Sequence, residues 1–317
     1  MRYVWILLIV CLAGCAASRP PAPAAAPPFA FALIGDMPYA DADLPRFDRL
    51  QSAINGDRSL AWVLHAGDIK TGASPCTDAY LSERLALLQR FTLPLVLIPG
   101  DNEWTDCHRA TAGGFQPLER LARLRALFYP TPGQSLGRPM ALTTQAAEPG
   151  YAEFPEHVRW ERAGVVFAAL HVVGSQNGLL PFEGRTEADD AESARRMDAA
   201  IAWLHAAFER ARAIDSPGVF LMIHANPGFD NRVAPPFDRF LAALEEETRA
   251  FGKPVVLAHG DSHYFRIDKP LLETGTGRRL IHFTRVETFG AADVHWLKVS
   301  VDARDANVFR IEPVLME

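Results

Sequence analysis

Short hydrophobic runs recur along the chain, each bordered by Gly, Pro or Asp. Apolar runs with such borders are typical of buried β-strands, because the turn residues separate one core segment from the next. The runs predict strands at 29–34, 60–64, 93–98, 165–173, 219–223 and 255–258.

Segments with the spacing of an amphipathic helix separate most of these runs. Leu44, Phe47, Leu50 and Ile54 fall on one helical face, which predicts a helix that packs by this face against a sheet. Alternating strands and helices predict a layered α/β fold with mainly parallel pairing, and the strand-rich segment after Ile267 predicts added antiparallel strands. The helical spacing recurs at 81–88, 118–124, 197–208 and 237–244.

Two stretches, 130–150 and 174–190, have no periodic pattern and contain Gly and Pro. Irregular segments of this length in a compact domain are often lids or binding loops, and others are plain surface excursions. Both interpretations stay open at this point.

The composition is that of an ordinary globular protein. With 317 residues, of which 49% are hydrophobic and 22% charged, the chain can bury a large core, and we expect a single domain over 29–317. The formal net charge of −6 provides no general attraction for nucleic acid or anionic lipid, so we expect no specific nucleic-acid binding. An anionic substrate would therefore be held by local cations.

The first residues have the pattern of an export signal, with Arg2 followed by an apolar segment and then by small residues. Residues 12–15, Leu-Ala-Gly-Cys, resemble a bacterial lipobox. This resemblance implies a lipoprotein-type signal peptide at 1–14, cleavage before Cys15 and a lipid on that cysteine. Ordinary signal-peptidase cleavage nearby is the alternative.

Residues 15–28 are almost entirely Ala and Pro after the cysteine. Such a composition cannot bury a core and acts as an extended tether. We therefore expect a periplasmic protein, anchored by its lipid to a bacterial outer membrane.

Export also changes the interpretation of the cysteines, because only Cys76 and Cys107 remain in the predicted domain. A periplasmic compartment permits disulfides, and we predict that the two pair. Two buried thiols are the alternative. Because Cys76 follows Asp68 and Cys107 follows Asn102, a disulfide would fix two loops relative to each other.

Metal-compatible side chains follow the ends of several predicted strands. In open α/β sheets, ligands bind at the carboxyl ends of the strands, so these side chains are expected to converge on one site. Carboxylate and amide oxygens together with imidazole nitrogens suit Mn, Fe or Zn ions better than Ca²⁺. The residues are Asp36, Asp68, Asp101, Asn102, His224, His259, Asp261 and His263.

The order of these segments resembles the calcineurin-like metallophosphoesterase superfamily, whose pattern runs Asp-x-His, Gly-Asp, Gly-Asn-His-Asp/Glu, a lone His and Gly-His-x-His. The resemblance covers residues from about 31 to 263. It implies a layered α/β/β/α sandwich with mixed sheets and two divalent metal ions. By resemblance, Asp36 holds one metal, Asp68 bridges both, His224 is the lone His and His263 is the last His.

Three positions depart from that pattern. Pro38 stands where the family has its first His. In the third segment, residues 100–103, either Asp101 replaces the family's Asn and Asn102 replaces its His, or one residue is inserted and Asn102 is the ligand. Adjacent side chains on an extended backbone point in opposite directions, so only one of the two is expected to reach the metal, and we favour Asn102.

The last segment departs from the pattern at Asp261, which stands where the family has the first His of its pair. His259, Asp261 and His263 share one face if the segment is extended, so all three would approach the site.

Supporting catalytic roles are expected for His65, His108 and Arg109. His65 lies two residues before Gly67 and would donate a hydrogen bond near the bridging carboxylate, or it is a buried structural histidine. His108 or Arg109 would contact a substrate phosphate, or they shape the loop at Cys107. Further candidates for phosphate contact are Lys70, Arg232 and Arg266.

A competing nucleophile motif, Gly-x-Ser-x-Gly, occurs at 133–137. It requires a strand before it and a helix after it, whereas Pro132 and Pro139 flank this copy inside a predicted loop. The sequence therefore predicts a two-metal hydrolase acting on small phosphomono- or phosphodiesters in the cell envelope. A non-catalytic envelope lipoprotein that keeps the fold and binds a metal or ligand is the alternative.

Overall fold

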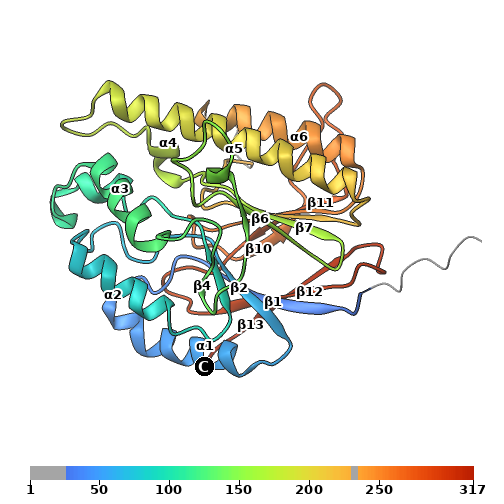
Figure 1. The fold of residues 1–317 in the computed structure, drawn as a ribbon, viewed down its shortest axis with the longest axis horizontal. Helices are drawn as coiled ribbons and strands as arrows, with labels where there is room; N and C mark the ends of the chain where they lie inside the picture. The colour runs from blue at the N-terminus through green and yellow to red at the C-terminus, as the bar shows by residue number, and fades with distance from the viewer. Residues whose placement is uncertain (1–25, 230–234) are drawn as a thin grey trace, which may run out of the picture.

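The computed structural model describes residues 26–229 and 235–317, in which two β-sheets lie face to face between layers of helices (Figure 1). The predicted signal peptide, Cys15, most of the tether and Arg232 lie outside the described residues. Nothing structural therefore bears on the predicted lipid anchor.

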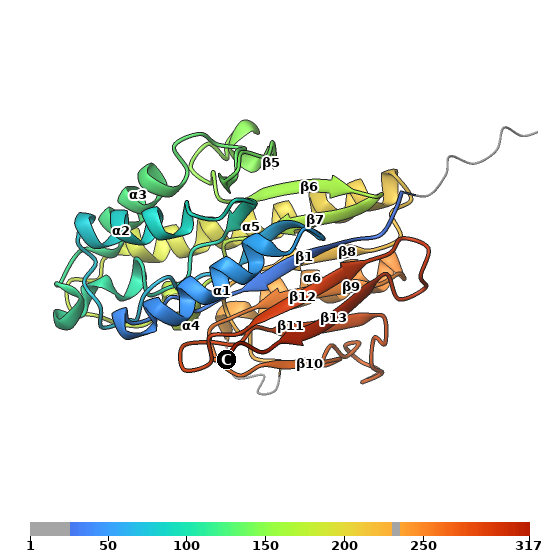
Figure 2. The same ribbon diagram turned by 90° about the horizontal axis from the view of Figure 1, so that it is seen from below.

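The first sheet has the strand order β13-β12-β1-β2-β3-β4. Three strands form its parallel centre: β1 (Phe29–Ile34), β2 (Leu60–His65) and β3 (Pro94–Leu97). Antiparallel strands extend both edges: β4 (Leu136–Gly137), β12 (Trp296–Val301) and β13 (Phe309–Val314). Figure 2 shows β1, β12 and β13 side by side. All six residues of β1 are buried, as expected for a strand covered on both faces.

The second sheet has the order β10-β11-β9-β8-β7-β6-β5. Its parallel centre contains β7 (Val165–Ala169), β8 (Val219–Met222), β9 (Val255–His259) and β11 (Phe283–Glu287). Its antiparallel edges are β5 (Thr143–Thr144), β6 (Val158–Arg162) and β10 (Arg266–Asp268).

Helices cover the outer faces of the two sheets (Figure 1). Side chains from α1 (Leu44–Gly56), α2 (Asp78–Leu88) and α3 (Pro117–Phe128) share one core with the first sheet. Those of α5 (Glu187–Ala213) and α6 (Asp238–Phe251) pack on the second. Short helical turns complete the chain: η1 (Asp41–Asp43), η2 (Thr105–His108), η3 (Ala110–Ala112), η4 (Gln145–Ala147), α4 (Gly174–Gly178) and η5 (Pro235–Phe237).

A third core lies between the sheets and is rich in aromatic rings. Phe31 packs edge-on against Phe220 at a centroid distance of 5.0 Å and against Phe167 at 5.8 Å, and it stacks on Trp62 at 5.5 Å. Such contacts add to the burial of large apolar surfaces and hold the two sheets in one fixed arrangement.

The predicted layered α/β/β/α sandwich with mixed sheets is thus confirmed. The predicted strand at 165–173 is shorter and ends at Ala169. The stretch 130–150, expected to be irregular, contains β4, β5 and η4, and β6 was not predicted. These edge elements are short or carry charged residues, so they lack the continuous apolar run that marks a buried strand.

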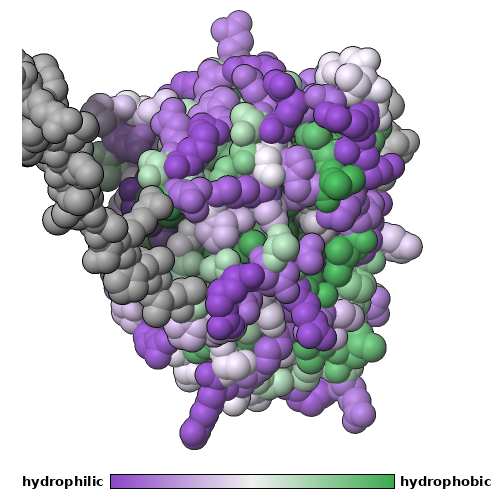
Figure 3. Space-filling model, turned by 90° about the vertical axis from the view of Figure 1, so that its right-hand side faces the viewer, coloured by the Kyte–Doolittle hydropathy of each residue, from purple (hydrophilic) through white to green (hydrophobic). Residues whose placement is uncertain are grey.

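Figure 3 views the end of the molecule at which β1 begins. This face is mostly hydrophilic, and hydrophobic residues gather along one side of it. A groove near the starts of β1, β9 and β13 is lined in part by Val256, Ile281 and Phe309. Within the described part of the chain, no helix is long and apolar enough to cross a membrane.

Candidate metal centre

The candidate site lies where the central strands end, and its residues stand at sharp backbone corners. Asp36 and Asp68 follow β1 and β2 with φ values of 56° each, while Asp261 and His263 follow β9 with φ values of 77° and 56°. Left-handed conformations are unfavourable for residues with a Cβ and concentrate at functional sites. At each of these residues the left-handed backbone directs the side chain toward the ends of the neighbouring strands.

Glycine beside these corners permits close approach of other segments. Gly67 has a φ of 94°, and a Cβ on it would lie 2.6 Å from Nδ1 of His224. A Cβ on Gly100 would overlap the carboxylate of Asp68. Glycine at these two positions therefore allows the opposing groups to approach closely, and at Gly67 it also allows the positive φ of the backbone turn.

Asp36, Asp68 and His263 form the first group of potential ligands, with their ligand atoms within 4.8 Å of one another. Nε2 of His263 lies 3.4 Å from Oδ1 of Asp36 and makes no hydrogen bond although the atom is buried. The Asp36 carboxylate raises the pKa of His263 above its usual value. A buried nitrogen that faces carboxylates without a hydrogen bond is an arrangement that a cation would complete.

Asp68, Asp101 and His224 form the second group, and all three are buried. Nδ1 of His224 lies 2.8 Å from the carbonyl oxygen of Ala66, to which it can donate. Nε2 then faces Oδ1 of Asp101 at 3.0 Å and Oδ1 of Asp68 at 3.5 Å. A backbone acceptor on one ring nitrogen orients the other toward a metal.

Asp68 belongs to both groups. Burial, reinforced by the nearby Asp101, raises the pKa of Asp68 well above its usual value. Burial alone would lower the pKa of His224, but the Asp68 and Asp101 carboxylates raise it above its usual value. Buried carboxylates at this density are costly without a compensating cation, and the mixed oxygen and nitrogen donors fit a divalent transition metal.

The third segment directs its two neighbouring polar side chains to different partners. The Asp101 carboxylate faces His224. The Asn102 amide nitrogen instead donates to Oδ2 of Asp68 at 2.5 Å and to the Tyr39 hydroxyl at 2.7 Å. As placed, Asn102 holds the shared carboxylate, whereas Asp101 contributes an oxygen to the second group.

In the last segment, Asp261 and His263 reach the site, but His259 is turned away from it. The Asp261 N–H donates to Oδ1 of Asp36 at 3.1 Å, and Oδ1 of Asp261 lies 4.0 Å from Nε2 of His224. Burial raises the pKa of Asp261 to about 6. The buried His259 has Nδ1 2.9 Å from the Gly260 carbonyl oxygen, and burial lowers its pKa to about 3.

His65 is a buried brace of the first corner. Its Nε2 lies 2.7 Å from the Met37 carbonyl oxygen, and its Nδ1 accepts the Gly67 N–H at 3.2 Å. Burial lowers the pKa of His65 to about 4, so the ring is neutral at physiological pH. Its contacts are with backbone on both sides, which leaves no nitrogen directed at a substrate.

His108 and Arg109 lie at the rim of the site, beyond Asp106. His108 is half-buried and stacks on Phe182 with ring centroids 4.5 Å apart. Arg109 forms an ion pair of 2.7 Å with Asp106, and its side chain is 44% exposed. Arg109 therefore presents a positive charge to solvent next to the candidate centre.

Lys70, the disulfide and Glu103 contact the backbone of the third segment and hold it in place. Nζ of the buried Lys70 donates to the carbonyl oxygen of Asn102 at 2.7 Å, and burial lowers its pKa to about 8. The predicted disulfide between Cys76 and Cys107 is present, and both sulfurs lie near that carbonyl, at 3.7 and 3.8 Å. Glu103 accepts the Gly100 N–H at 2.7 Å and the Asp68 N–H at 3.2 Å.

Two residues near the site were not predicted from the sequence. The Tyr39 hydroxyl donates to Oδ2 of Asp68 at 3.4 Å, and its ring packs edge-on against His263 at 4.7 Å. Ser175, at the end of the segment that follows β7, donates to Oδ2 of Asp101 at 2.5 Å. Ser175 follows the predicted strand at 165–173, so the strand-end rule could have found it, whereas Tyr39 carries no such signal.

Arg266 was named from the sequence as a further candidate for phosphate contact. In the structure it forms an ion pair with Glu287 at 2.7 Å.

Comparison with known proteins finds the fold but no near relative. No family model matches the chain, and no curated protein matches it. A solved dimetal phosphatase from Danio rerio matches with a TM-score of 0.51 and 14% identity, over 90% of this chain and 98% of its own. A structure of PhoD matches with a TM-score of 0.53 and 12% identity, over 89% of this chain and 66% of its own. The chain therefore has the calcineurin-like metallophosphoesterase fold, as the sequence predicted.

Proposed function

We propose that the protein is a metal-dependent phosphoesterase with a two-metal centre. One observation carries this proposal: the two groups of potential ligands share a single buried carboxylate, Asp68. A shared carboxylate with separate partners on either side is the arrangement that holds two ions close together.

In this proposal, Asp36, Asp68 and His263 hold one ion, and Asp68, Asp101 and His224 hold the other. Asp261 adjoins the second group, 4.0 Å from His224. Mn, Fe or Zn suits these donors, and such ions would supply Lewis-acid activation of the phosphoryl group and of water.

Residues of the chain itself supply binding and orientation. Arg109, held by Asp106, binds a non-bridging oxygen of a small phosphoester. Asn102 and Tyr39 fix Asp68 by hydrogen bonds to its Oδ2. His108, the half-buried imidazole next to Arg109, is the proposed proton donor to the leaving group.

We further propose that the enzyme acts in the periplasm, as a lipoprotein attached to the outer membrane through Cys15. The support is the N-terminal pattern of Arg2, an apolar segment and residues 12–15. A disulfide between Cys76 and Cys107 agrees with an oxidising compartment.

The function is tested with nitrophenyl mono- and diesters in the presence of added Mn²⁺. Purified wild-type protein should hydrolyse at least one of them, and Asp68→Asn should not. Metal analysis of the same samples should find about two transition-metal ions per wild-type chain. Equal rates for the two proteins would refute the catalytic proposal.

A non-catalytic binding protein of the same fold is the second candidate. It is favoured by Pro38, which stands where the sequence resemblance expects the first imidazole, and by the departures from the family pattern at residues 100–103 and 259–263. Metal binding without hydrolysis of either ester class would support it.

A further inference from the structure

The segment after β7 is wound into a left-handed turn. Ser175, Gln176 and Asn177 have φ values of 50°, 54° and 58°. Consecutive non-glycine residues in this conformation are rare, because each Cβ crowds the following carbonyl oxygen. Such strain persists only when surrounding contacts enforce it, which makes the turn a candidate for a functional role.

Helix α5 supplies the contacts that hold the turn. Arg196 is fully buried and donates to Oδ1 of Asn177 at 2.6 Å and to its carbonyl oxygen at 2.9 Å. Ser193 donates to the same carbonyl oxygen at 2.9 Å. Glu192 pairs with Arg196 at 2.9 Å and balances its charge. The turn is therefore clamped at Asn177 by a buried guanidinium.

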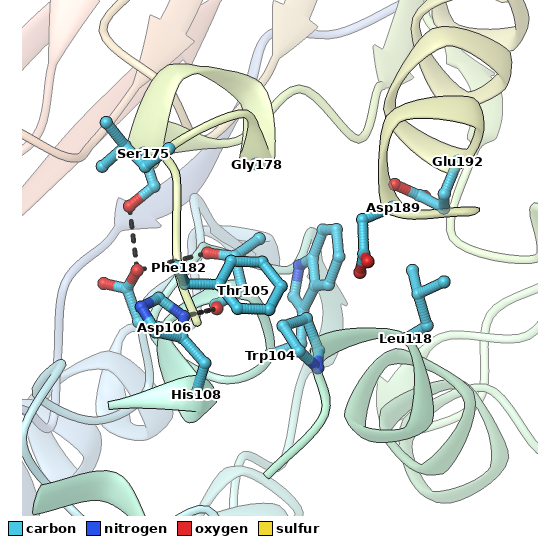
Figure 4. A pocket seen from close by; sticks show the side chains of 12 residues that line it. Trp104, Thr105, Asp106, His108, Leu118, Ser175, Gly178, Phe182, Asp189 and Glu192 are labelled. Carbon is cyan, nitrogen blue, oxygen red and sulfur yellow. Dashed lines mark hydrogen bonds between the residues drawn. The ribbon is translucent and has the colours of Figure 1, made fainter. Parts of the chain in front are cut away.

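The other end of the turn meets the candidate centre. The Ser175 hydroxyl lies 2.5 Å from Oδ2 of Asp101. It also lies 2.9 Å from Oδ1 of Asp106, and Figure 4 draws this second contact. A Cβ on Gly174 would lie 2.7 Å from Oδ1 of Asp261 and 2.9 Å from Oδ2 of Asp101. The backbone thus approaches two carboxylates as closely as a glycine permits.

The two oxygens of Asp101 consequently have different partners. Ser175 contacts Oδ2, while Oδ1 faces Nε2 of His224 at 3.0 Å. A carboxylate can otherwise rotate and exchange its oxygens, so a hydrogen bond to one oxygen fixes the direction of the other.

We propose that Ser175 is a positioning residue that orients Asp101 for metal binding beside His224, and that the left-handed turn clamped by Arg196 exists to place its hydroxyl. This inference rests on the proposed metal centre and assigns a role in it to a residue outside the ligand set. The group formed by Asp36, Asp68 and His263 has no contact with Ser175 among those described, so the effect is confined to one of the two ions.

Three variants separate the effect of the Ser175 hydroxyl from the effect of the left-handed backbone conformation. Ser175→Ala removes the hydroxyl and keeps a Cβ in the turn. Ser175→Gly removes the hydroxyl and the left-handed strain together. Gln176→Gly is the matched control, because Gln176 is exposed and its replacement relieves the same kind of strain while Ser175 is kept. Thermal unfolding of the metal-free proteins checks that each variant folds.

The readout is titration of the metal-free proteins with Mn²⁺, with free Mn²⁺ followed by electron paramagnetic resonance. Both Ser175 variants should weaken one of two binding steps by about 10–100-fold, the range for loss of a hydrogen bond to a ligand, and leave the other unchanged. Gln176→Gly should bind both ions like the wild type.

Wild-type affinities in both Ser175 variants would overturn the inference while leaving the proposed function intact. A loss in Gln176→Gly as large as in Ser175→Gly would also overturn it, because the backbone rather than the hydroxyl would then be responsible. No Mn²⁺ binding by the wild type would refute the two-metal centre itself.

Discussion

The side-chain amide of Asn102 donates a hydrogen bond to Oδ2 of Asp68 at 2.5 Å, and the Asn102 N–H donates to Oδ1 of the same carboxylate at 3.1 Å. One residue thus binds both oxygens of the carboxylate that the two ligand groups share. As placed, Asn102 therefore orients the shared carboxylate through both of its oxygens.

Replacing Asn102 by Ala should loosen Asp68 and weaken metal binding by about 10–100-fold, because an outer hydrogen bond to a ligand is lost. Titration with Mn²⁺ measures the affinity, and kcat/KM for a nitrophenyl ester should fall with it. Asn226→Ala is the control, since Asn226 contacts Asp261 through its backbone N–H, which the substitution retains. Equal losses in the two variants would contradict a specific role for Asn102.

Replacing Arg109 by Ala should lower kcat/KM by about 10-fold, mainly through a higher KM. A charge-assisted hydrogen bond to phosphate is worth roughly 1.5–3 kcal/mol, and solvent around this half-exposed side chain reduces it toward the lower value. Arg310→Ala, whose side chain is 77% exposed on β13, should leave the kinetics unchanged. A fall in kcat alone would show that Arg109 does not bind the ground-state substrate.

Replacing both Cys76 and Cys107 by Ser should lower the free energy of unfolding by about 3–4 kcal/mol, because a loop with a sequence separation of 31 residues is no longer closed. Urea denaturation of the oxidised wild type and the double variant measures the difference. Metal affinity should fall as well, since both sulfurs lie against the Asn102 carbonyl. A variant as stable as the wild type would show that the link does not restrict the unfolded chain.

His157 should make the protein lose stability as the pH falls below about 6.5, because this buried histidine stays neutral in the folded state. Burial lowers the pKa of His157 to about 3, so below its ordinary value the unfolded state binds more protons than the folded state. The stabilisation is complete above pH 6.5 and decreases toward pH 3, by up to about 2 kcal/mol from this residue at pH 5. Urea denaturation of His157→Gln at pH 7.5 and pH 5 should show a smaller difference than the wild type; an equal difference would contradict this account.

The sequence by itself predicted the sandwich and most of its central elements. The strands β1, β2, β8 and β9 are continuous apolar runs, and the helices that cover the sheets have an apolar face at regular spacing, so both patterns are local. Edge strands such as β6 were not predicted, because they form by pairing with a neighbouring strand and their own composition gives little sign of it. The positions of Asp36, Asp68, His224 and His263 at strand ends were likewise readable, because parallel strands bring their carboxyl ends to one edge.

Only the tertiary structure decided which of these side chains meet. Asp101 faces His224 and Asn102 faces Asp68 because the corner at Gly100 packs against the Asp68 loop, a contact between segments that no local pattern encodes. Ser175 points into the site because its left-handed backbone torsions rotate the side chain by an amount that an extended strand does not predict. His259, the last residue of β9, instead turns its Nδ1 toward the Gly260 carbonyl oxygen. The sequence determines which donor atoms are available, since that depends on residue type and order. Their geometry depends on contacts between residues far apart in the chain, and these exist only once the two sheets have packed.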